Sequence, residues 1–197
     1  MSLDDILARP FGTLPELIRL HAGHRPHHPA LVQDERTLDY AALDALMDRI
    51  AAALQRDGLQ PGNAIAICAA ASVEYAAVFL GGLRAGIAVA PLAPSSTAAS
   101  VATMAADAGA KLLFLDAAVA QALEPVRERI AARRIGLDAA NDSFAAWLAP
   151  VLTAGWAIYQ SLPRPYYGLV APDPGSCTAK FVGCTAGPRG FFLLRPC

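Results

Sequence analysis

The sequence predicts an α/β fold in which crossover units build a parallel sheet with helices on both faces. Three short apolar runs, 64–68, 88–92 and 111–115, lack the alternation of half-exposed strands, which is typical of parallel strands buried on both faces. The segments between them, 73–85 and 98–108, have a helical pattern of small and apolar residues. Strand, helix, strand, helix and strand at these lengths indicate connected crossover units.

A helix and a hairpin are predicted before the first of these strands. Thr13 and Glu16 have the spacing of a capping box, so a helix begins there and ends near Gly23. Two extended stretches, 30–32 and 37–38, then flank a polar turn, which predicts a small β-hairpin.

An amphipathic helix follows over 40–56, with Asp39 as its N-cap. Its apolar residues recur at helical spacing and are predicted to face the core: Leu43, Leu46, Met47, Ile50 and Leu54. Polar residues occupy the opposite face.

Hydroxyl residues precede the two crossover helices. Ser72 is placed to cap the helix 73–85, which has so few charges that it should be nearly buried on all sides. Ser95, Ser96 and Thr97 offer caps for the helix that ends at 108. A further helix from Ala117, kinked near Pro125, leads to 135–137 and to a short helix that ends near 147–148.

Composition excludes several classes of protein. The formal net charge is −1 and the pI is about 6.4, so we expect no nucleic-acid partner. No apolar run reaches the roughly 18 to 20 residues of a membrane span. The first five residues carry two acids rather than the bases of a secretory signal. We therefore expect a cytoplasmic protein without a membrane span.

The cysteines and histidines do not have the spacing of a recognised metal site. The four cysteines, at positions 68, 177, 184 and 197, match no zinc or redox motif and are predicted to be free thiols. The only histidine cluster is His21, His24, His27 and His28. A metal site there is one alternative; solvated imidazoles at a helix end are the interpretation we favour, so no metal ligands are predicted.

The chain changes character after Pro150, which divides it into a first domain over 1–150 and a tail over 151–197. The last 47 residues hold one of the seventeen acids, six of the fifteen prolines, six of the fifteen glycines and three of the four cysteines. No helical or strand period persists there. The tail is either a divergent, loop-rich or disordered region, or a segment translated out of the ancestral frame, which is the interpretation we favour.

Five passages in the first domain have the order and spacing of a known family. They lie at 29–32, 37–43, 58–67, 75–92 and 107–114, and include Gly-Leu-Gln-Pro-Gly-Asn-Ala-Ile-Ala-Ile and Asp-Ala-Gly-Ala-Lys-Leu-Leu. They resemble the N-terminal portion of the adenylate-forming (AMP-binding) superfamily, of the acyl-CoA synthetase type. The resemblance covers 13–150 and implies that the parallel sheet is a partial N-terminal subdomain of such an enzyme.

The resemblance implies ATP, Mg²⁺ and CoA as ligands of the intact family, with a small carboxylate as substrate. The family binds phosphates with a loop of the form Ser-Gly-Thr-Thr-Gly-x-Pro-Lys-Gly, whose backbone N–H groups approach ATP. The nearest match in this chain supplies a degraded candidate loop: Gly183, Thr185, Gly187, Arg189 and Gly190. Val182, Cys184 and Ala186 depart from the pattern and remove two hydroxyls and one glycine.

The other parts that the resemblance implies, a Mg²⁺-binding acid and a catalytic C-terminal domain, would follow this loop. We therefore expect no catalytic residue in the chain, no tight binding of ATP, Mg²⁺ or CoA, and no activity of the chain alone. Two alternatives remain: an amino-acid adenylation fragment of a nonribosomal peptide synthetase, and a non-catalytic remnant or interaction module whose exposed apolar surface allows self-association. A Rossmann dinucleotide site is excluded because the turn at 69–72 reads Ala-Ala-Ala-Ser.

Overall fold

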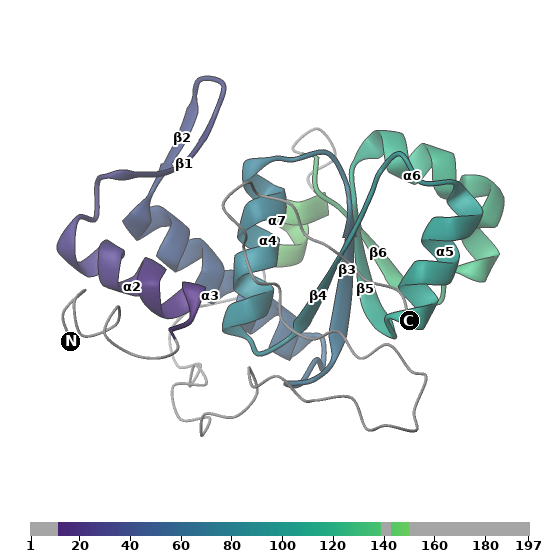
Figure 1. The fold of residues 1–197 in the computed structure, drawn as a ribbon, viewed down its shortest axis with the longest axis horizontal. Helices are drawn as coiled ribbons and strands as arrows, with labels where there is room; N and C mark the ends of the chain where they lie inside the picture. The colour runs from purple at the N-terminus through teal and green to yellow at the C-terminus, as the bar shows by residue number, and fades with distance from the viewer. Residues whose placement is uncertain (1–11, 139–142, 150–197) are drawn as a thin grey trace. The chain divides into compact units, whose positions relative to one another are not determined.

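A parallel four-stranded sheet is the centre of the protein (Figure 1), whose computed structural model describes residues 12–138 and 143–149. Its strand order is β4-β3-β5-β6 and every neighbouring pair is parallel. The strands are β3 (Ala64–Cys68), β4 (Ala88–Leu92), β5 (Ala110–Leu115) and β6 (Arg133–Gly136). The predicted α/β class and its three strands are confirmed.

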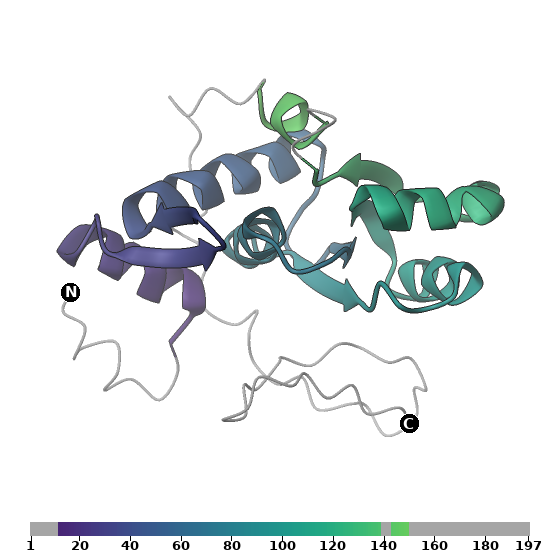
Figure 2. The same ribbon diagram turned by 90° about the horizontal axis from the view of Figure 1, so that it is seen from above.

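Helices cover both faces of the sheet (Figures 1 and 2). One face, which includes Ile65, Ile67 and Phe114, packs against helices α3 (Tyr40–Arg56), α4 (Val73–Arg84) and α7 (Ser143–Leu148). The other face, which includes Cys68 and Leu113, packs against α5 (Ala98–Asp107), α6 (Ala117–Leu123) and the 3₁₀ helix η1 (Glu124–Arg129). Alternate residues of β3, β4 and β5 therefore enter two separate cores, whereas β6 contributes Ile135 to the first.

A smaller third core joins the N-terminal elements to α3. Helix α2 (Leu14–His24) and the antiparallel hairpin of β1 (Pro29–Gln33) and β2 (Arg36–Asp39) pack around buried Ile18, Leu43 and Met47. The hairpin projects beyond the helices at the upper left of Figure 1. It is also tied to α4, because the Arg36 guanidinium bonds the Glu74 carboxylate at 2.6 Å.

Side-chain caps fix the starts of the helices, as the sequence predicts. Thr13 and Glu16 form the complete capping box of α2. Asp39, Ser72 and Thr97 each accept a hydrogen bond from the first turn of α3, α4 and α5, respectively. Each cap satisfies a backbone N–H that has no partner within its own helix.

Helix α4 is pressed closely against its neighbours, and none of its twelve residues is exposed. Gly81 makes this approach possible, since a Cβ at that position would lie 2.5 Å from Cγ2 of Ile50 on α3. Arg84, only 4% exposed, reaches from α4 to the carboxylates of Asp44 and Asp48 on α3. The same guanidinium donates to the carbonyl of Pro15 at 3.3 Å, so it joins three helices.

The structure differs from the sequence prediction at the far edge of the sheet. The segment around 135–137 forms a fourth strand, β6, which the sequence analysis did not identify. Two arginines precede Ile135, its one fully buried residue, so the apolar run is too short to predict a strand.

The kink predicted near Pro125 is the change from α6 to η1. In the described part of the chain, no helix is long and apolar enough to cross a membrane.

Candidate functional site

The carboxyl ends of β3 and β5 are the place where this architecture usually binds ligands. Strand β3 connects through α4 to β4 on one side, whereas β5 connects through α6 to β6 on the other. In open parallel sheets, ligands bind in the crevice where neighbouring strands lead away in opposite directions. The loops after Cys68 and Leu115 form this switch point.

Asp116 directly follows β5, so its carboxylate lies at the switch point. Its Oδ2 accepts a hydrogen bond from the backbone N–H of Ala70 at 2.7 Å, and its Oδ1 accepts one from the N–H of Val119 at 2.8 Å. One carboxylate therefore joins the loop after β3 to the first turn of α6. A phosphate placed here would meet this carboxylate and would lose both N–H donors to it.

The first turns of the other two crossover helices are capped as well. Ser72 accepts from the N–H of Tyr75 at 3.0 Å, and the side-chain carbonyl of Gln33, from the hairpin, accepts from the N–H of Val73 at 3.0 Å. Thr97 caps α5 in the same way. The backbone N–H groups of Val73, Tyr75 and Ser100 at these helix starts are therefore used by protein side chains and are not open to a phosphate.

Cys68 lies buried at the end of β3 and does not have the character of a nucleophile. Burial, and then the nearby charge of Asp116, raises the pKa of its thiol to about 11. Its Sγ lies 3.8 Å from the carbonyl oxygen of Ala93. Because the thiolate is the reactive form, this thiol is chemically inert near neutral pH.

The buried thiol predicts a loss of stability in alkali. Since the pKa of Cys68 is raised in the folded state, its contribution is complete below pH 9 and falls away as the pH rises toward 11. The free energy of unfolding should decrease by about 2 kcal/mol between pH 8 and 11, since the full loss of about 3 kcal/mol is reached only above pH 11. Urea unfolding between pH 8 and 11 measures it, with Cys68→Ala as the control for all other ionising groups. Parallel pH profiles of the two proteins would contradict the prediction.

The histidine cluster is exposed at His24, His27 and His28, as expected for solvated imidazoles, whereas His21 is buried and corrects that interpretation. His21 is buried, with Arg25 nitrogens 3.1 Å from both ring nitrogens and the Tyr40 ring 4.9 Å away. Burial, and then Arg25, lower the pKa of His21. His27 lies 3.3 Å from Asp39, and His28 contacts the carbonyl of Pro29. Among residues 12–138 and 143–149, no three histidine, cysteine or acidic side chains are grouped to hold a metal ion.

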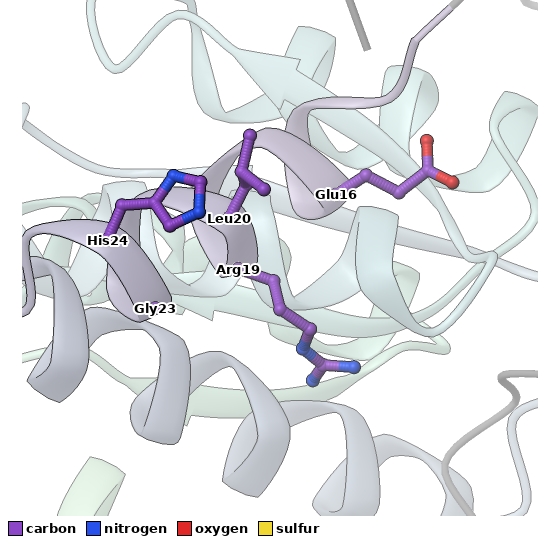
Figure 3. A pocket seen from close by; sticks show the side chains of 5 residues that line it. All are labelled: Glu16, Arg19, Leu20, Gly23 and His24. Carbon is purple, nitrogen blue, oxygen red and sulfur yellow. The ribbon is translucent and has the colours of Figure 1, made fainter. Parts of the chain in front are cut away.

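A hollow of about 270 Å³ lies along the outer side of α2 (Figure 3). Its described lining comes from this one helix: Glu16, Arg19, Leu20, Gly23 and His24. The side chains spread away from one another in Figure 3. Glu16 is used in the capping box and Arg19 bonds Asp48 at 2.8 Å, so the two charged groups already have partners within the protein.

The residues of the candidate phosphate loop, Gly183, Thr185, Gly187, Arg189 and Gly190, lie outside the described residues. The sequence analysis missed Asp116 and Gln33 as determinants of this edge. Asp116 directly follows a predicted buried strand, which is a usable signal. Gln33 reaches Val73 across forty residues, and nothing local to the sequence indicates that contact.

The sequence matches known proteins over most of its length. The family of AMP-binding enzymes matches residues 18–157. The fatty acid–[acyl-carrier-protein] ligase ScoC of Streptomyces coeruleorubidus is 33% identical over 184 residues, which are 93% of this chain and 33% of ScoC. The probable non-canonical nonribosomal peptide synthetase CymA of Salinispora arenicola is 35% identical over 118 residues, 60% of this chain and 2% of CymA.

The fold is also found among solved structures. The N-terminal domain of FACL13 from Mycobacterium tuberculosis superposes with a TM-score of 0.67 at 24% identity, over 75% of this chain and 38% of that one. A benzoate CoA ligase from Burkholderia xenovorans has a TM-score of 0.64 at 20% identity, over 71% of this chain and 28% of the ligase. The chain spans about a third of the length of ScoC. From the match over residues 18–157 and the shared parallel sheet, the chain belongs to the family of AMP-binding, adenylate-forming enzymes.

Proposed function

We propose that this chain is scaffold of an ATP-dependent acyl-activating ligase, and that it does not form an acyl-adenylate by itself. The reaction of the whole enzyme would join a small carboxylate to ATP, release pyrophosphate, and pass the acyl group to the thiol of CoA or of a carrier protein. ATP, Mg²⁺ and CoA are ligands of that whole enzyme. The same proposal places the protein in the cytoplasm.

The observation that supports this proposal is that protein side chains already bond backbone N–H groups at the carboxyl ends of the parallel strands. The Asp116 carboxylate fills the switch point, and the crossover helices are capped by Ser72, Gln33 and Thr97. An adenylating enzyme has to stabilise the charge that develops on phosphate with donors aimed at it. The backbone donors that meet Asp116, Gln33, Ser72 and Thr97 hold the scaffold together, so phosphate binding would depend on other donors.

The degraded loop over 183–190 is the proposed remainder of the phosphate site in this chain. Arg189 stands where the family pattern has lysine and retains the positive charge. The two missing hydroxyls and the missing glycine would weaken contacts with the phosphates. We therefore propose that the loop does not bind ATP tightly.

A second candidate is the amino-acid adenylation domain of a nonribosomal peptide synthetase, because CymA and similar synthetases match a large part of the chain. The neighbouring gene sequence separates the two candidates. A carrier-protein domain encoded in the same reading frame downstream would favour the synthetase, whereas its absence together with a separate carrier or CoA-dependent partner would favour the acyl ligase.

Carboxylate-dependent exchange between ATP and pyrophosphate tests the proposed inactivity. We expect the purified chain, with Mg²⁺ and a set of fatty, aromatic and amino acids, to give no exchange above a no-enzyme blank. An active adenylating enzyme of this family serves as positive control. Clear exchange would refute the proposal, and an Arg189→Ala variant would then establish whether the loop over 183–190 is responsible.

The tail over 151–197 is proposed to result from a shift of reading frame, with a native divergent segment as the alternative. The match to ScoC favours the alternative in part, because 93% of the chain cannot be contained within residues 1–150. Translation of the DNA beyond the codon for Pro150 in all three frames tests the two. A complete Ser-Gly-Thr-Thr-Gly-x-Pro-Lys-Gly loop in another frame would establish the shift, and its absence from every frame would leave the native segment.

A further inference from the structure

His21 is held in a contact that only a neutral imidazole can make. The Nε of Arg25 lies 3.1 Å from Nδ1 of His21, and a terminal nitrogen of the same guanidinium lies 3.1 Å from Nε2. A guanidinium has donors only, so one ring nitrogen of His21 has to accept. An imidazolium has no acceptor, and it would place a second positive charge against the first. Protonation of His21 is therefore incompatible with this arrangement.

The surroundings of His21 offer no compensating acid within the described part of the chain. Its own helix contributes His24 and Arg25, the following turn contributes His28, and α3 contributes the ring of Tyr40. Asp39, which precedes Tyr40 in the chain, is bound by His27 and by the N–H of Ala42. Further along α3, Asp44 and Asp48 are paired with Arg19 and Arg84. The C-terminal carbonyls of α2 favour a positive charge on His21. The guanidinium of Arg25 opposes it, because it places a full positive charge in direct contact with the ring.

The same residues form the junction between α2 and the start of α3. The N–H of Arg25 donates to the carbonyl of His21 at 2.8 Å. Tyr40 and Ala41 donate their N–H groups to the carbonyls of His28 and Pro26, at 3.2 and 3.0 Å. Arg25 also lies over the Tyr40 ring, 5.5 Å from its centre. If Arg25 and His21 separate, the turn loses the side-chain packing that holds these backbone bonds.

We propose that His21, Arg25 and Tyr40 form an acid-sensitive latch, which opens the junction between α2 and α3 when His21 takes up a proton. The far end of the hairpin stays attached to α4, because Gln33 bonds the N–H of Val73 and Arg36 bonds Glu74. The opening is thus confined to the turn over 25–29 and the first turn of α3. The latch is independent of the proposed function, since it uses none of the residues at the sheet edge.

Imidazole nitrogen NMR combined with amide hydrogen exchange on the full chain tests the latch between pH 8 and 5. We expect His21 to take up its proton at lower pH than an ordinary histidine, because its pKa is lowered by burial and by Arg25. The opening equilibrium at Tyr40 and Ala41, corrected for the intrinsic exchange rate, should rise by up to about tenfold per pH unit, the limit for one coupled proton. Amides of β3 and β5 should not respond.

Three variants separate the latch from general acid effects. His21→Gln keeps an acceptor without a titrating charge, so the pH dependence at Tyr40 and Ala41 should disappear. His27→Gln, at a side chain that is 90% exposed, is the matched control and should retain the wild-type response. Arg25→Gln removes the repelling charge, so His21 should protonate more easily and the pH dependence of opening should shrink or disappear. Titration of His21 without a change in exchange, or an unchanged response in both His21→Gln and Arg25→Gln, would overturn the proposal.

Discussion

Replacing Arg84 with methionine should destabilise the protein by about 3 kcal/mol. Removing one partner of a buried ion pair leaves an uncompensated charge, which typically costs 3–5 kcal/mol. The lower end applies because Asp44 and Asp48 are 19% and 24% exposed and both keep Arg19 as a partner. The contact with the carbonyl of Pro15 is lost as well. Urea unfolding followed by far-UV circular dichroism measures the effect.

The exposed pair of Arg36 and Glu74 provides the control. The Arg36 side chain is 59% exposed, and exposed ion pairs contribute roughly 0–1 kcal/mol. Arg36→Met should therefore change the free energy of unfolding by less than about 1 kcal/mol. Adding Asp44→Asn to Arg84→Met should recover part of the loss, because it removes one of the two carboxylates that have lost Arg84 as a partner. Equal effects of the two arginine substitutions would refute the central role of Arg84.

Substituting Gly81 with valine should be similarly severe, with a loss of about 3 kcal/mol. A Cβ at this position would lie 2.5 Å from Cγ2 and 2.7 Å from Cβ of Ile50, which is fully buried. Overpacking a core typically costs 1–3 kcal/mol, and occasionally more. A β-branched side chain adds two methyl groups to the clash. The same unfolding experiment measures the change.

Gly23, in α2, is the matched control for a helical glycine in open space. No atom lies within 4 Å of a Cβ placed there. Gly23→Ala should stabilise the protein by about 0.5 kcal/mol, because alanine loses less backbone entropy in a helix. If Gly81→Val proved neutral, α3 and α4 would have to be separable without cost, contrary to the packing described above.

Local sequence signals predicted the elements and their limits because those limits depend on nearby residues. The capping box of Thr13 and Glu16, and the caps at Ser72 and Thr97, each act within three residues of themselves. The buried strands were recognised from continuous apolar runs for the same reason. Strand β6 was missed because its pairing with β5, rather than its own composition, makes it a strand.

The candidate site could be predicted only in part, for a related reason. The family pattern predicts a degraded candidate for a phosphate loop by its residue types, and that candidate lies outside the described residues. The features that decide the sheet edge are contacts between distant positions, such as Asp116 with Ala70 and Gln33 with Val73. Burial of His21 likewise depends on Tyr40 and not on the histidine-rich turn itself. Tertiary contacts of this kind leave no periodic trace in the sequence.

The hydrogen bond between Trp147 and Asp57 can form only after residue 147 has been synthesised, so the packing of α7 on α3 and the sheet is a late step of folding. The indole N–H donates to Asp57 Oδ2 at 2.8 Å, and Arg56 donates to the carbonyl of Trp147 at 2.9 Å, across about ninety residues. The Trp147 ring also meets Phe114 edge-on, with ring centres 5.2 Å apart. During synthesis, α3 and β5 therefore leave the ribosome well before Trp147, which packs against Phe114 of β5 and bonds the end of α3. Until then the apolar surface around Phe114 stays uncovered, and a nascent chain paused before that codon would be the form most prone to associate.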